Sequence, residues 1–215
     1  MIVEIWSDVV CPWCYVGKRR LEHALEQFAH RDQVELTWRS FQLDPSAPPE
    51  RTHSSVEHLA AKYGMSVEQA EQSNAQMTEL AAREGLEYHL DRTRGGNSFD
   101  AHRLIHLAAR HGRQDAMKER LMRAYFTEGE PLGDKQILVR LATEVGLDAA
   151  EARAALEGEA FADTVHADEE LAARIGIRGV PYFVLDRRYG VSGAQPAELL
   201  LEALDKTWEA RADAA

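Results

Sequence analysis

Cys11 and Cys14 are the two cysteines of the 215-residue chain, and they enclose the dipeptide Pro-Trp. Thiols at this spacing lie one helical turn apart, so they can exchange a disulfide with each other and with a substrate. Pro12 suits the first position of a helix, where its missing N–H costs nothing. We therefore expect Cys11 to cap a helix, to accept hydrogen bonds from the N–H groups of Trp13 and Cys14, and to have a lowered pKa.

The simplest chemistry for this pair is dithiol–disulfide exchange, in which Cys11 attacks a substrate disulfide and Cys14 then releases the substrate. One alternative is a zinc site that also uses His102 and His106. Zinc needs about two further ligands, however, and the chain has no second Cys-x-x-Cys. Plain packing of the pair is another alternative. We favour redox chemistry, and we expect neither a metal nor another bound cofactor.

The elements that must position the pair follow from the apolar spacing. Residues 2–6 and 34–41 have the pattern of strands, and residues 12–28 between them have helical spacing, which predicts a parallel βαβ unit. Residues 54–175 are rich in helix formers and predict six or seven helices. Residues 182–185 and 189–192 predict a hairpin, and Pro196 begins a last helix.

This order of elements predicts an α/β protein with a thioredoxin-like fold. Residues 1–45 and 176–215 would form the thioredoxin-like domain. Residues 46–175 would form a large all-α helical insertion between its βαβ and ββα halves.

Composition and charge exclude several classes of protein. A net charge of −11 repels phosphate backbones, which argues against a nucleic-acid partner. No polybasic run and no apolar run of spanning length suggests a membrane. The first residues lack the pattern of a secretory signal, so we expect a cytoplasmic protein. A reducing cytoplasm disfavours a purely structural disulfide, which again indicates chemistry for the pair.

Four segments occur in an order that is found in a known family: residues 7–14 (SDVVCPWC), 97–103 (NSFDAHR), 179–184 (GVPYFV) and 191–196 (VSGAQP). Together they resemble the DsbA family, and more closely its cytosolic FrnE-like branch. The resemblance covers nearly the whole chain. It implies a thioredoxin domain with a helical insertion and a protein-disulfide oxidoreductase, including reductase or isomerase activity. The expected partners are protein or small-molecule thiols and disulfides.

The resemblance also implies roles for residues. Cys11 is the attacking cysteine, Cys14 the resolving one, and Pro181 a cis-proline that faces them; the alternative is an ordinary trans proline in a turn. The backbone of Val180 would pair with an extended substrate. The candidate substrate-binding residues are Trp13, Val180, Asn97, His102 and Tyr182.

Some of these candidates also have ordinary explanations. Asn97 fits a normal helix N-cap, and His102 fits normal helix packing. Asp8 is expected to be a polar turn residue, although a carboxylate there could oppose a thiolate or move protons for Cys14. Tyr15 is expected to join Trp13 and Tyr182 in an apolar rim around Cys11.

Departures from the resemblance leave alternatives open. Trp13 stands where DsbA has histidine, so we expect a weaker oxidant. The runner-up function is a glutathione-dependent isomerase or transferase, of the 2-hydroxychromene-2-carboxylate isomerase or kappa-class type. Those proteins have serine at the position of Cys11 and a Ser-Asp pair near Ala194-Gln195, and both are missing here. Glutathione remains a candidate co-substrate, and a non-catalytic binding module is a third class.

Overall fold

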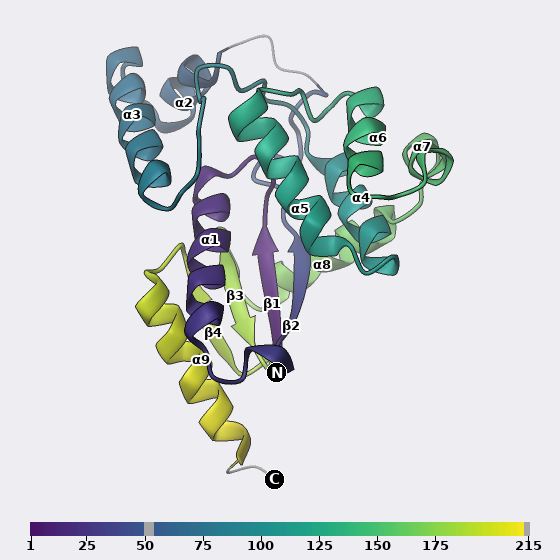
Figure 1. The fold of residues 1–215 in the computed structure, drawn as a ribbon. Helices are drawn as coiled ribbons and strands as arrows, with labels where there is room; N and C mark the ends of the chain where they lie inside the picture. The colour runs from purple at the N-terminus through teal and green to yellow at the C-terminus, as the bar shows by residue number, and fades with distance from the viewer. Residues whose placement is uncertain (50–53, 213–215) are drawn as a thin grey trace. The chain divides into compact units, whose positions relative to one another are not determined.

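The computed structural model describes residues 1–49 and 54–212. They belong to two compact units, which are named here the sheet unit, Met1–Leu43 with His166–Ala215, and the helical unit, Asp44–Val165 (Figure 1). The sequence predicted unit boundaries after residues 45 and 175, whereas the structure has them after residues 43 and 165. The second boundary differs because most of α8, Ala162–Arg174, packs with the sheet.

The sheet has the strand order β2-β1-β3-β4. Strand β1 (Ile2–Ser7) pairs in parallel with β2 (Glu35–Ser40) and antiparallel with β3 (Tyr182–Leu185), which pairs with β4 (Tyr189–Ser192). The predicted βαβ and ββα halves are therefore confirmed, and the two ends of the chain share one sheet.

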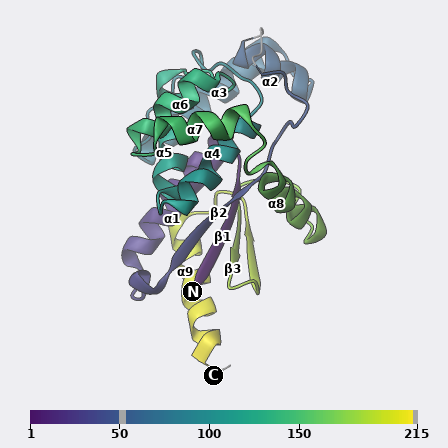
Figure 2. The same ribbon diagram turned by 90° about the vertical axis from the view of Figure 1, so that its right-hand side faces the viewer.

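Helices cover both faces of this sheet. Helices α1 (Pro12–Gln27) and α9 (Ala197–Ala212) pack against each other on one face, and α8 lies on the other (Figures 1 and 2). A short 3₁₀ turn, η1 (Arg31–Gln33), connects α1 to β2. On the α8 face, Trp6, Ala172 and Ile177 form a buried cluster.

Asp168 ties α8 to the sheet through three hydrogen bonds. Its carboxylate accepts from Arg39 Nη1 at 2.9 Å and from the Ser40 N–H at 2.9 Å. Its backbone carbonyl accepts from Trp6 Nε1 at 3.0 Å. Arg39 also pairs with Glu4 of β1. The buried carboxylates of Asp168 and Glu4 therefore share Arg39 as a charged partner, as burial of a charge requires.

The helical unit begins with α2 (Ser55–Tyr63) and α3 (Val67–Arg83), which pack against each other. Each starts with a capping box, Ser54 with Glu57 and Ser66 with Gln69, which explains where the two helices begin. Helix α4 (Phe99–Arg110) contacts α5 (Gln114–Arg123), α6 (Lys135–Glu144) and α7 (Ala149–Glu157). Leucine, isoleucine and methionine side chains fill the space between them.

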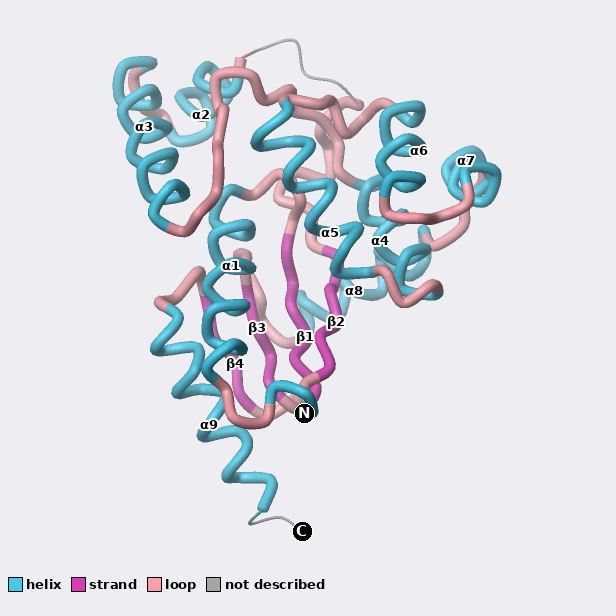
Figure 3. The backbone as a smooth tube through the Cα atoms, in the orientation of Figure 1, coloured by secondary structure: helices cyan, strands magenta, loops and turns pink. Residues whose placement is uncertain are grey.

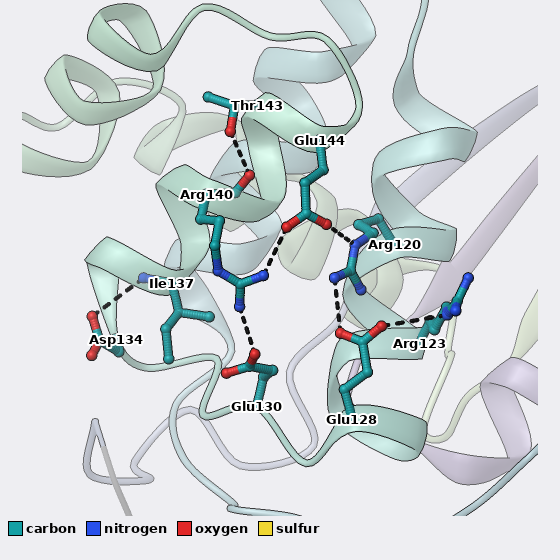
Figure 4. A network of polar contacts seen from close by, with 9 residues as sticks. All are labelled: Arg120, Arg123, Glu128, Glu130, Asp134, Ile137, Arg140, Thr143 and Glu144. Atoms are coloured by element: carbon teal, nitrogen blue, oxygen red, sulfur yellow. Dashed lines mark hydrogen bonds and ion pairs between the residues drawn. The ribbon is translucent and has the colours of Figure 1, made fainter.

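A π-helical turn, η2 (Ala124–Glu128), continues α5 and is held by ion pairs (Figure 4). Arg120 lies between Glu128 at 2.8 Å and Glu144 at 2.5 Å. Arg140 extends the network from Glu144 at 2.7 Å to Glu130 at 2.5 Å. Among the described residues, no helix is long and apolar enough to cross a membrane.

Candidate active site

One edge of the sheet brings the predicted catalytic residues together. Trp6, near the end of β1, pairs with Tyr182, the first residue of β3. The start of α1 and the segment before β3 therefore lie at the same end of the sheet (Figure 3). Segments from near the two ends of the sequence meet there. Local sequence patterns alone do not show that these distant segments are neighbours.

The cysteine pair is reduced and buried at this edge. Cys11 is 4% exposed and Cys14 is 1% exposed, and both are free thiols. The Cys14 N–H donates to the Cys11 carbonyl at 3.0 Å, which is the first turn of α1. The thiol of Cys11 donates to the carbonyl oxygen of Val180 at 3.7 Å. The Val180–Pro181 peptide bond is cis, as predicted.

The predicted capping of α1 is only partly correct. Cys11 is the N-cap residue with an extended backbone, and Pro12 takes the first helical position, but the sulfur makes no capping hydrogen bond. The expectation that the sulfur accepts from Trp13 and Cys14 is therefore wrong. The physical reason is that the thiol donates its proton toward the Val180 carbonyl instead.

The expected low pKa of Cys11 is also wrong for this reduced pair. The hydrogen bond with Cys14, then burial, then the charges of Cys14 and Asp8 raise the pKa of Cys11 well above its ordinary value. The nearby backbone N–H of Cys14, which makes no capping hydrogen bond to the sulfur, lowers the pKa of Cys11 but is outweighed. The direction of this shift favours the thiol form of Cys11 over the thiolate.

Asp8 is fully buried, although the sequence suggested a polar turn residue. Its carbonyl accepts from the Cys11 N–H at 3.3 Å, which closes the turn between β1 and α1. Its carboxylate accepts from the Leu43 N–H at 2.8 Å and from the Val10 N–H at 3.5 Å. Asp8 thus joins the segment that follows β2 to the turn that carries the cysteines.

Gly17 is a site residue that the sequence reasoning missed. A Cβ atom on Gly17 would lie 2.8 Å from Cγ of Pro181 and 3.4 Å from Cζ of Phe183. The absent side chain therefore lets α1 lie directly against the cis-proline. A glycine inside an otherwise regular helix was the available signal, because it weakens the helix and needs a packing reason.

The expected apolar rim is less uniform than predicted. Trp13 is 46% exposed, whereas Tyr15 is 3% exposed and belongs to the core. Tyr182 is half-buried and packs against the cluster of Trp6 on the α8 face. Trp13 is therefore the member of this group whose ring is open to a substrate, and the roles predicted for Trp13 and Tyr182 stay predictions.

The remaining candidates belong to the helical unit. The Asn97 side chain donates to the carbonyls of Pro45 at 3.0 Å and Ala47 at 3.1 Å, and accepts from the Phe99 N–H at 2.8 Å. These bonds fix the loop that begins the unit. His102 and His106 are buried in α4. Their binding roles, and that of Asn97, stay predictions.

Within residues 1–49 and 54–212, no three His, Cys, Asp or Glu side chains are grouped so that they could hold a metal ion. The Cys₂His₂ alternative needs such a group.

Solved structures provide comparisons for this fold. The crystal structure of a "probable DsbA oxidoreductase" from Streptomyces coelicolor is 50% identical, covers 97% of this chain and 90% of its own, and superposes with a TM-score of 0.93. The cytosolic disulfide reductase DsbM from Pseudomonas aeruginosa, solved with GSH, is 19% identical over 97% of this chain and all of its own, with a TM-score of 0.68.

A 2-hydroxychromene-2-carboxylate isomerase structure is 14% identical, covers both chains fully, and has a TM-score of 0.72. At such identities, the reductase and the isomerase are similar in fold alone. The model of the DSBA-like thioredoxin domain family matches residues 2–205. This chain, with its cysteine pair at the start of α1 and its cis-proline before β3, belongs to the DSBA-like thioredoxin domain family.

Proposed function

We propose that the protein is a thiol–disulfide oxidoreductase that works in the reducing direction through Cys11 and Cys14. The observation that carries the proposal is the contact between the Cys11 thiol and the Val180 carbonyl, at 3.7 Å, beside the second thiol. It places the sulfur next to a backbone segment with which an extended disulfide substrate can pair.

The proposed exchange proceeds in two steps. Cys11 loses its proton, its sulfur attacks one sulfur of a substrate disulfide, and the other substrate sulfur leaves as a thiolate and takes up a proton. Cys14 then loses its proton and attacks Cys11, which releases the second substrate thiol. The substrate gains two electrons and two protons, and the protein is left with a Cys11–Cys14 disulfide.

A thiol reductant must then restore the pair. Two molecules of a small thiol such as glutathione can do so, and leave as their own disulfide. GSH is present in the DsbM structure, which supports glutathione as a candidate co-substrate here. The proposal needs no other cofactor.

The raised pKa of Cys11 supports the reducing direction. A strong oxidant of this kind owes its potential to a stabilised reduced form, in which the thiolate is favoured. Here the hydrogen bond with Cys14, then burial, then the charge of Asp8 raise the pKa of Cys11, which disfavours the thiolate. We therefore expect a potential below the roughly −120 mV of DsbA.

The test is reduction of a fluorescent peptide disulfide by the purified protein with glutathione, together with the glutathione redox equilibrium. Cys11→Ser should abolish turnover, and Cys14→Ser should stop after a mixed disulfide forms on Cys11. A potential near −120 mV would contradict the direction, and turnover by Cys11→Ser would contradict the mechanism. The isomerase alternative instead predicts glutathione-dependent turnover of an aromatic substrate that survives Cys14→Ser.

A further inference from the structure

The segment that leads to the cis-proline carries unpaired backbone groups. Among the described residues, the N–H groups of Arg178, Gly179 and Val180 donate no hydrogen bond, because β3 starts only at Tyr182. The carbonyl of Val180 already contacts the Cys11 sulfur. A Cβ atom on Gly179 would meet nothing within 4 Å. This segment therefore borders open space next to the reactive sulfur.

Arg178 adds an unpaired charge to this segment. Its side chain is exposed, and it makes no ion pair or hydrogen bond with any residue that the structure describes. Other arginines of the sheet unit are engaged: Arg39 binds Glu4 and Asp168, and Arg20 donates to the Ala194 carbonyl at 2.6 Å. Arg178 is thus available for a ligand.

The spacing brings this charge within reach of a bound substrate. Arg178 lies two positions before Val180, and two positions of backbone span at most about 7 Å. If a substrate strand pairs with this segment, with its cysteine opposite Val180, the residue two positions away lies opposite Arg178. A long arginine side chain also reaches the diagonal neighbour.

We propose that Arg178 is a specificity-determining residue that binds a carboxylate of the substrate close to the reactive disulfide. The inference rests on the proposed function, and it names the substrate class: disulfides whose cysteine is followed by a free carboxyl group or by an acidic side chain. A guanidinium binds a carboxylate through two parallel hydrogen bonds, which a lysine or an amide cannot reproduce. Glutathione disulfide and acidic peptide disulfides both present this group.

The experiment compares matched substrates. Disulfide-linked dimers of the peptides Cys-Ala-Glu, Cys-Ala-Gln and Cys-Ala-Lys represent the peptide source, and glutathione disulfide with its glycine ethyl ester represents the free carboxyl group. Pre-reduced wild-type protein, whose own dithiol supplies the two electrons of a single turnover, should react with the Glu peptide up to about fivefold faster, as a second-order rate constant, than with the Lys peptide, because one exposed ion pair contributes about 0.2–1 kcal/mol. Preference confined to glutathione disulfide over its ester would identify the terminal carboxylate as the source.

Variants of exposed arginines then test the residue itself. Arg178→Gln should bring the Glu to Lys ratio close to one, and Arg178→Glu should invert it. Arg188 is the matched control because it is an exposed arginine at the β3–β4 turn, beyond the other end of β3. Arg188→Gln should keep the wild-type ratio. Equal rates on all substrates by wild type, or an unchanged ratio in Arg178→Glu, would overturn the proposal.

A binding measurement separates this inference from the proposed function. S-methylglutathione cannot be reduced, and its binding can be titrated by the fluorescence of the exposed Trp13 ring. Tighter binding of S-methylglutathione than of its glycine ethyl ester, lost in Arg178→Gln, supports the carboxylate site even if no disulfide is turned over. Turnover without any such discrimination would leave the oxidoreductase intact and refute the role of Arg178.

Discussion

Replacement of Gly17 by alanine tests the packing of α1 against the cis-proline. The added methyl carbon would lie 2.8 Å from Cγ of Pro181, well inside normal contact distance, and the proline ring cannot rotate away. Either α1 or the segment before β3 must therefore move. Because this segment carries the carbonyl that contacts the Cys11 thiol, the displacement should be felt in catalysis.

Two opposing free energies decide the sign of the effect on stability. Alanine in place of glycine inside a helix stabilises it by about 1 kcal/mol. Overpacking by one methyl group in a tight contact costs about 1–3 kcal/mol. We therefore expect Gly17→Ala to lower the free energy of unfolding by roughly 1 kcal/mol, the central value of the balance between the two effects.

The assay combines urea unfolding of the reduced protein with kcat/KM for peptide disulfide reduction. The kcat/KM should fall because Val180 and Cys11 no longer keep their spacing. Gly179→Ala is the stability control, since a Cβ there meets open space and the backbone is not left-handed. If Gly17→Ala raises the stability by about 1 kcal/mol with unchanged activity, only helix propensity matters at this position and the packing argument is refuted.

Four further predictions concern charge and backbone strain. Asp8→Asn removes a charge that raises the pKa of Cys11, so alkylation of Cys11 should begin at lower pH; an unchanged rate–pH profile would contradict this. Folding raises the pKa of the Cys11 thiol. The resulting contribution to the free energy of unfolding of the reduced protein is present below the ordinary thiol pKa and is lost as pH rises through the pKa of the folded state. Urea unfolding at a series of pH values can follow this loss. Arg187→Gly should stabilise the protein by about 0.5–1 kcal/mol, because Arg187 has φ 56° in a turn that favours glycine. A loss of stability in thermal unfolding would contradict this and would show that the ion pair of Arg187 with the buried Glu4 carboxylate dominates. Arg120→Gln should cost about 1 kcal/mol in urea unfolding and Arg140→Gln less than about 0.5, because the Arg120 side chain is 16% exposed and that of Arg140 is 45% exposed; equal losses would contradict the role of burial.

The elements of the sheet unit could be predicted closely from the sequence. The expected helix of residues 12–28 is α1, Pro12–Gln27, and the expected strand of residues 34–41 is β2, Glu35–Ser40. Both depend on local patterns, since proline marks a helix start and apolar spacing marks helix and strand. The cis bond before Pro181 followed from the family resemblance, and the structure has it.

What the sequence could not predict depends on contacts between distant residues. The direction of the Cys11 sulfur is set by a carbonyl from residue 180, so helix-capping rules alone gave the wrong partner. The sequence suggested a surface turn for Asp8, because the local pattern does not show that the Leu43 N–H pairs with its buried carboxylate. Gly17 had no visible role until the position of Pro181 was known.

The split of the sheet unit has a consequence for biosynthesis. The contact between Cys11 and Val180 joins residues that are 169 positions apart, and the whole helical unit lies between them in the sequence. At translation speeds of about 5–20 residues per second, the thiols leave the ribosome roughly 10–30 s before the cis-proline segment exists. Throughout that interval β1 lacks the neighbour that it will have in β3, and its free edge is open to other chains. Until the last strands are made, the nascent cysteine pair therefore lacks the burial that the folded sheet unit gives it.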